Sequence, residues 1–499
     1  MKRIGLSIAE NLSSQGLSGR DSDEIDRLLT EYKASVLKST IKAKGRENFE
    51  LKDDVKDDEG KLLLSKGAPK NDSELRIYLG KLLSMNLEHP IEYYIGVINP
   101  EEVAKLHNKM VDIAASLSEN GVIENFDEMK KVIEEVVSCL SNDIILLNRM
   151  TVLESEYVSG FGESLLVAVL STAIGEKHSY DFDKKVCVFT AGLLHHIGEI
   201  PLYSLFNKGR IKNEKLPYDD IARIRNHPIT GYLILSGSDE IPVEIRDAVL
   251  RHHLFLDGSG YPRNLKLTEK DDLAKLICLT SSFVTMQTRG RKKMEQVLRL
   301  LDIYSRTKTR TGEKIAPLYD REFYMALLSL DPRKMILRGY ENDDKYARDY
   351  SCEDIMRLHN SYVFFKKRNE ELHKLAETIE SFISNNSIPS EAESNVDVLF
   401  GYISKLRNLT SDAKEFTGMS ELKKIPNALP ELMLDAEVIR MELKGYVGGL
   451  EETFSNLTPL FEKDQDSWIL KKAMQFTTRI RNNLPNSLLD KCCGSSPVS

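Results

Sequence analysis

The chain has 499 residues, of which 41% are hydrophobic and 29% charged, and its formal net charge is -8. This length predicts two to four domains, and the composition is that of an ordinary globular protein. The negative net charge argues against a general binder of nucleic acids or anionic membranes. The first residues lack the apolar stretch of a signal peptide, and the most apolar segment, 164–175, is too short to span a bilayer. We therefore expect a cytoplasmic protein.

The first 99 residues are predicted to form a small α/β module. A helical pattern lies within residues 1–45, and a strand, a turn at 58–60 and a short apolar strand follow it. A second turn at Lys66 and Gly67 precedes a helix that is expected to begin near Asn71.

Residues 100–334 are predicted to form a helical domain, because apolar residues recur there with a period of about 3.6. Two His-His pairs lie in this domain, although the chain has only ten histidines. His195 and His196 end one apolar helix, and His252 and His253 end another before a Gly-rich loop. Imidazole is the commonest metal ligand, and helix ends that converge in a core often build such sites. The pattern therefore indicates a candidate metal site.

The six cysteines include no CxxC pair, so neither a zinc ribbon nor a disulfide framework is indicated. Cys139, Cys187 and Cys278 lie in apolar runs and are interpreted as small core residues.

Residues 335–499 are predicted to form a helical interaction region. Between Ile355 and Ile383, apolar residues recur in steps of three and four, with Asn369 on the same seam. The pattern fits a coiled coil that pairs chains or docks a partner, and it equally fits a long helix inside an intramolecular bundle. The mainly α fold class applies in both cases.

The motifs LLHHIGEIP, NHP and HHLFLDGSGYP, in this order and spacing, resemble the HD-GYP family. The resemblance covers roughly residues 145–331 and implies a helical HD-superfamily fold that hydrolyses cyclic di-GMP at a centre of two or three metals. It also implies a place in bacterial signalling. The segment 335–499 resembles no family that we can name.

Several of the family's functional residues are replaced in this sequence. The resemblance places its early histidine on Glu163, the aspartate of its HD pair on His196 and its lysine on Glu199. Its last metal-binding aspartate falls on Ser281, and the acidic residue after the second pair falls on Leu254. A neutral imidazole offers one lone pair and cannot bridge two cations as a carboxylate does. Glu199 would repel a substrate phosphate.

These replacements predict a degenerate site. The candidate metal ligands are Glu163, His195, His196, His227, His252 and His253. The candidate ligand-binding residues are Glu199, Asp257, Gly260, Tyr261, Pro262, Arg289 and Lys292, the last two near the family's phosphate-binding basic residues. The loop from Asp257 to Pro262 is alternatively explained by the backbone needs of a tight turn.

Three states of the site are compatible with the sequence: no metal, one divalent transition metal (iron or manganese), or a working polynuclear centre. The first two favour a non-hydrolytic protein that binds a protein partner or cyclic di-GMP. The third favours a divergent metal-dependent cyclic di-GMP phosphodiesterase.

Overall fold

The computed structural model describes short segments at 49–51, 54–56, 62–67 and 93–95, and then residues 100–485 with gaps. The gaps are 144–145, 148, 151–152, 155–157, 203–223, 237, 239, 263–264, 289–293, 311–312, 333–351, 386–389, 412–428 and 461–466. The chain divides into two compact units. The first comprises residues 1–254, 262–284 and 329–335, and the second comprises 255–261, 285–328 and 336–499.

The described part is mainly α-helical, as the sequence predicted. In the N-terminal module, β2 (Val55–Lys56) pairs with β3 (Leu62–Leu64) in antiparallel fashion, on either side of the predicted turn at 58–60. A further antiparallel pair is formed by β1 (Phe49–Leu51) and β4 (Tyr93–Ile95). The helices expected within 1–45 and from Asn71 lie outside the described residues.

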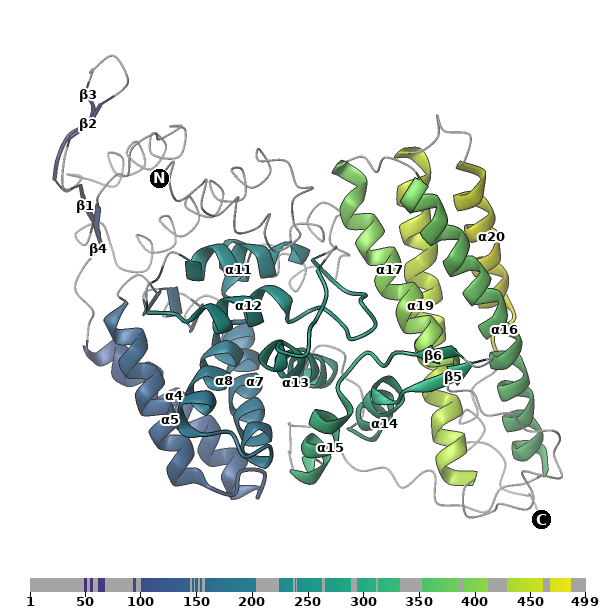
Figure 1. Ribbon diagram of the computed structural model, residues 1–499, viewed down its shortest axis with the longest axis horizontal. Coiled ribbons are helices and arrows are strands. Elements are labelled where there is room, and N and C mark those ends of the chain that lie inside the picture. The colour runs from purple at the N-terminus through teal and green to yellow at the C-terminus, as the bar shows by residue number, and fades with distance from the viewer. Residues whose placement is uncertain are drawn as a thin grey trace, which may run out of the picture. The chain divides into compact units, whose positions relative to one another are not determined.

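The first unit is built from helices that pack against one another (Figure 1). The residues buried between them are mostly apolar. Its elements are α4 (Pro100–Glu119), α5 (Phe126–Asn142), α7 (Val158–Lys177), α8 (Phe182–Leu194), the 3₁₀ helix η2 (Ile197–Leu202), α11 (His227–Ser236), α12 (Val243–Arg251) and most of α13 (Asp272–Thr288). Helix α8 approaches α7 closely at Gly192, where a Cβ would lie 2.6 Å from the Cα of Ala168. The two backbones can pack at this distance only because Gly192 has no side chain.

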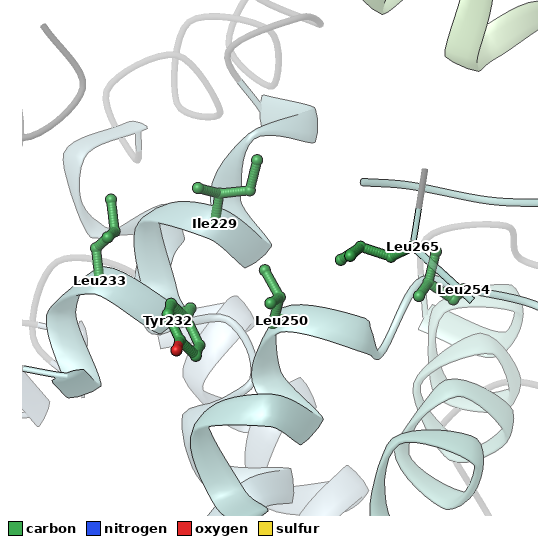
Figure 2. Packing of buried hydrophobic residues seen from close by; sticks show 6 residues of the cluster. All are labelled: Ile229, Tyr232, Leu233, Leu250, Leu254 and Leu265. Carbon is green, nitrogen blue, oxygen red and sulfur yellow. The ribbon is translucent and has the colours of Figure 1, made fainter. Parts of the chain in front are cut away.

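Helices α11 and α12 are joined by a buried apolar cluster, shown in Figure 2. Its members are Ile229, Tyr232, Leu233, Leu250, Leu254 and Leu265. Burying a leucine side chain contributes about 2 kcal/mol relative to leaving it exposed. The cluster therefore fixes the start of α11 relative to the end of α12, where two of the candidate histidines lie.

The second unit combines a short hairpin with long helices (Figure 1). Its elements are α14 (Met294–Ser305), β5 (Lys308–Arg310), β6 (Glu313–Ile315), α15 (Arg321–Ser329), α16 (Cys352–Asn385), α17 (Ser390–Ser411), α19 (Leu429–Leu460) and α20 (Ser467–Asn482). The β5–β6 hairpin, with Lys308 opposite Ile315, interrupts a region that the sequence indicated as almost wholly helical. Thr307 and Thr309 favour this local change, because β-branched threonine is enriched in strands.

Polar contacts tie α14 to α19. Arg299 forms an ion pair with Asp435, and the hydroxyl of Tyr304 donates to that of Tyr446 at 3.1 Å. Burial raises the pKa of both tyrosines well above the usual value, so both stay neutral. Helix α14 therefore packs with the C-terminal helices, and residues 285–328 belong to the same unit. The domain boundaries at 100 and 335 stay a prediction.

The seam of α16 is buried within the chain. Leu358 and Phe365 are fully buried, and the hydroxyl of Tyr362 donates to the carbonyl of Leu432 on α19 at 3.2 Å. Helix α16 packs against α17, α19 and α20, which run beside it (Figure 1). The alternative of an intramolecular bundle thus describes this part of the seam.

Among the described helices, none is both long and apolar enough to cross a membrane.

Candidate metal centre

Helix ends carry the histidines. Helix α8 begins at an N-cap, where the side chain of Asp181 accepts from the Lys184 amide at 2.8 Å, and it ends at His195. Helix α12 ends at His252, and α11 begins with His227. Pro228 follows at a helix start, where the missing N–H of proline costs nothing. The local signals for starting and ending helices therefore also place the imidazoles.

Three of these rings are each held by the same kind of hydrogen bond to a backbone carbonyl. The Nδ1 atoms of His195, His227 and His252 lie 2.7, 2.8 and 2.7 Å from the carbonyl oxygen three residues earlier. A carbonyl oxygen only accepts, so Nδ1 must carry the proton in each ring. For α8 and α12 this bond also satisfies a carbonyl of the last turn, which the helix itself leaves without a partner. Nε2 is therefore the bare nitrogen when these rings are neutral.

This tautomer brings two lone pairs face to face. The Nε2 atoms of His227 and His252 lie 3.1 Å apart in the buried interior. Two bare nitrogens at this distance repel unless a proton or a cation lies between them. Burial lowers the pKa of His252 to about 4, so a proton is not available there at neutral pH. A cation relieves the repulsion, since two ligand nitrogens about 2.0–2.1 Å from one ion lie about 3 Å apart.

Four imidazoles converge around this point. One nitrogen from each of His196, His227, His252 and His253 lies within 4.8 Å of the others. The rings of His252 and His253 are 4.0 Å apart between centroids, and those of His227 and His253 are 5.0 Å apart. The donor set is that of a transition-metal site, because imidazole nitrogen suits zinc, copper, iron and nickel. The residues present therefore fit a metal ion.

The two other predicted metal ligands lie outside this group of four. The His195 ring is adjacent, with its centroid 3.8 Å from that of His196 and 5.1 Å from that of His252. Glu163 is buried on α7. Ser281, which stands where the family has an aspartate, is buried on α13, and its hydroxyl carries no charge.

Glu199 lies beside His196 in the first unit. Its Oε2 is 3.9 Å from Nδ1 of His196, and both side chains are buried. The cause is local: the Glu199 amide donates to the His196 carbonyl at 2.9 Å, which is a 3₁₀ turn. Side chains three residues apart eclipse one another in a 3₁₀ helix. The sequence had marked Glu199 only for its effect on a phosphate.

In the predicted ligand-binding loop, the side chain of Asp257 is hydrogen-bonded to residues of the second unit. Asp257 accepts from the Ser259 amide at 3.0 Å and from its hydroxyl at 2.6 Å, and the Ser404 hydroxyl of α17 donates to its other oxygen. Gly258 and Gly260 have φ of +83° and +102°. Only glycine adopts these values without strain, so the tight-turn explanation accounts for both glycines.

The other predicted ligand-binding residues lie partly in the two units and partly outside the described residues. Tyr261 is half-buried in the second unit, and Pro262 is buried in the first. Arg289 and Lys292 lie outside the described residues. Leu254 is part of the cluster in Figure 2, so the position after the second His pair serves the apolar core.

Gly198 also positions the site, although the sequence motifs did not indicate this role. A Cβ at this residue would overlap the carbonyl oxygen of His227 and lie 2.7 Å from the amide nitrogen of Gly231. The missing side chain therefore lets η2 lie against the start of α11, which brings His196 near His227. The signal available in the sequence was the position of Gly198 within the motif LLHHIGEIP. The residues that it packs against, His227 and Gly231, are distant in the sequence.

Comparison with known proteins agrees with the motifs. A family model described as an HD domain matches residues 147–310. The cyclic di-GMP phosphodiesterase response regulator RpfG of Xanthomonas campestris pv. campestris is 37% identical over 76 residues, which cover 15% of this chain and 19% of that protein. A cyclic di-GMP phosphodiesterase of Thermotoga maritima is 27% identical over 159 residues, 31% of this chain and 40% of that protein. The matches thus span less than half the length of either relative.

A solved structure also matches, titled Bd1817, a HDG"Y"P protein from Bdellovibrio bacteriovorus. It has a TM-score of 0.29 and 15% sequence identity, and the match covers 57% of this chain and 94% of that one.

The family match and the two phosphodiesterase relatives show that the centre of this chain is a domain of the HD superfamily. The domain is of the HD-GYP kind, as its two His pairs and its DGSGYP loop predicted.

We expect the metal-free first unit to lose stability in acid. His252 has a folded pKa of about 4 against a usual 6.5, and burial also lowers the pKa of His253. Between these values the unfolded chain binds the proton and the folded chain does not, so stability rises with pH. The loss from pH 7 to pH 4 is on the order of 3 kcal/mol for His252 alone.

Urea unfolding of chelator-treated protein between pH 7 and pH 4 measures this loss. The variant His252→Gln, which does not titrate, should show a shallower pH dependence. Equal slopes for the two proteins would contradict the prediction.

Proposed function

We propose that the HD domain holds one transition-metal ion in its four-imidazole group and acts by binding rather than by hydrolysis. The observation that carries this proposal is the 3.1 Å approach of the His227 and His252 Nε2 atoms, both bare by their backbone contacts. A bound cation is the arrangement that makes this geometry stable at neutral pH.

The chemistry of the donors favours one ion over two. An imidazole that coordinates a metal is a neutral ligand, and the positions of the family's bridging and second aspartates hold His196 and Ser281. Two divalent ions would bring four positive charges into a buried group that contains no carboxylate ligand of its own, which is costly. A single ion also lacks the second metal that supports a shared hydroxide.

The number of protein ligands is a second reason to expect that the domain acts by binding rather than by hydrolysis. Structural zinc sites with four protein ligands are closed, whereas catalytic zinc sites keep a position open for water, and four imidazoles match the ligand number of the closed kind. Of the two metals expected from the sequence, iron suits imidazole, whereas manganese prefers carboxylate and water oxygens. We therefore propose iron as the resident ion.

The domain would then serve as a binding or scaffold element for a protein partner, with cyclic di-GMP as a second ligand class. The relatives named above are cyclic di-GMP phosphodiesterases, which supports the second class. A protein partner or a second chain that used 335–499 would meet the outer faces of its helices, because the described seam residues of α16 are buried within the bundle.

We expect no hydrolysis of cyclic di-GMP by protein loaded anaerobically with iron or with manganese, and at most one metal ion per chain by elemental analysis. The physical reason is the lack of a carboxylate that could bridge two ions. Product formation that disappears in His227→Ala would instead establish a divergent phosphodiesterase.

The double variant His196→Asp with Ser281→Asp is the matched test of this reason. It returns two carboxylates to the positions where the family has them, and we expect its metal content to rise above that of the natural chain. An unchanged content would show that these two positions do not limit metal binding.

A further inference from the structure

The residues at 196 and 199 differ from the family pattern as a pair. The resemblance places an aspartate and a lysine there, and this chain has His196 and Glu199. The acid and the base have therefore exchanged places within one 3₁₀ turn. The structure keeps the pair close, with Nδ1 of His196 3.9 Å from Oε2 of Glu199.

We propose that Glu199 is a positioning residue for the metal centre, acting through His196. The inference rests on the proposed function, because it needs a metal ion in the four-imidazole group. The Glu199 carboxylate accepts the Nδ1–H of His196, which leaves Nε2 of that ring to face the metal.

The other ligand rings show why His196 needs such a partner. His227 and His252 each donate Nδ1–H to a backbone carbonyl three residues earlier, and these bonds fix which nitrogen is bare. His196 has a carboxylate in the corresponding place. A ligating histidine whose other nitrogen is bonded to a carboxylate has a fixed orientation and is a more basic ligand.

The negative charge of Glu199 is the second reason to assign it a role at the metal centre. The four imidazoles bring no negative charge to a divalent ion. Glu199 is buried, and its carboxylate lies beside one of the four rings. Its negative charge offsets part of the charge of the ion without occupying a coordination position.

A hydrogen bond between His196 and Glu199 requires their side chains to move slightly closer together. A distance of 3.9 Å is longer than a charge-assisted hydrogen bond of about 2.8 Å. The backbone bond from the Glu199 amide to the His196 carbonyl, at 2.9 Å, holds the turn, so side-chain rotation closes the gap. The proposal therefore predicts that the bond shortens when the metal binds.

Binding of Co²⁺ to the full-length chain, followed by its visible absorption and by competition with a chelator, tests the proposal. We expect Glu199→Gln to weaken Co²⁺ binding by about 10- to 100-fold, the range typical for partners of metal ligands. Glu199→Asp, which keeps the charge, should recover part of the affinity. Glu176→Gln, at a half-buried carboxylate on α7, is the control and should bind Co²⁺ as the natural chain does.

A second readout separates positioning from a merely structural role. The midpoint of thermal unfolding without metal should change little in Glu199→Gln, while the increase caused by Co²⁺ should shrink. The nitrogen NMR signal of His196 should show Nδ1 protonated in the Co²⁺-free and Zn²⁺-bound natural chain, and should shift in Glu199→Gln.

Each outcome decides the proposal. If Glu199→Gln binds Co²⁺ as tightly as the natural chain, the positioning role is wrong while the metal centre stands. If it loses stability equally with and without metal, Glu199 is only structural. If the natural chain binds no metal at all, the proposed function and this inference both fail.

Discussion

Replacement of His227 by alanine is expected to remove metal binding from the chain. His227 provides one of the two nitrogens that face each other at 3.1 Å, and its ring also lies 5.0 Å from that of His253. Loss of a direct ligand should cost more than loss of a ligand's hydrogen-bond partner, so we expect affinity to fall by about 100-fold or more. Elemental analysis and Co²⁺ titration measure this effect.

The same variant should lose its thermal response to metal. An ion that binds only the folded state raises the midpoint of unfolding, so this rise should disappear in His227→Ala. His107→Ala changes a partly exposed histidine on α4 outside the group of four and should keep the full response. Metal binding of natural strength in His227→Ala would remove the geometric basis of the proposed centre.

Replacement of Gly198 by alanine is expected to prevent stable folding of the first unit. The added Cβ would overlap the carbonyl oxygen of His227 and approach the amide nitrogen of Gly231 to 2.7 Å. Both neighbours are backbone atoms at the start of α11, so neither can rotate away as a side chain would. We expect a loss of more than about 3 kcal/mol, beyond the usual cost of overpacking.

Urea unfolding of the metal-free protein measures this loss, and Gly162→Ala is the matched control. A Cβ at Gly162 on α7 would have no atom within 4 Å, and alanine favours a helix over glycine by about 0.5–1 kcal/mol. The control should therefore be slightly more stable than the natural chain. Equal midpoints for Gly198→Ala and Gly162→Ala would show that η2 moves away from α11 without cost.

Helix α16 of the second unit shows what a periodic apolar pattern can predict and what it cannot. Steps of three and four residues along 355–383 predicted a long helix with one apolar face, and α16 has that form. The pattern could not identify the surface that covers this face, because a bundle and a coiled coil bury the same positions. Only the packing of α17, α19 and α20 against α16 decides between them.

The sequence by itself determined the helical class of the central region, the HD-GYP kind of domain and the histidines at the ends of helices. These features depend on residues close together in the chain, such as a cap, a glycine or an adjacent pair of imidazoles. Local periodicity and short motifs report them directly.

The tertiary structure alone decided which histidines meet. His196, His227 and His253 come from three separate helix ends, and Glu163 was an equally good candidate from its residue type. The apolar cluster between α11 and α12 and the close approach at Gly198 bring the four imidazoles together. The contact between His227 and His252 joins residues that are 25 positions apart in the chain. Distances of this kind depend on the packing of whole helices, which no local pattern encodes.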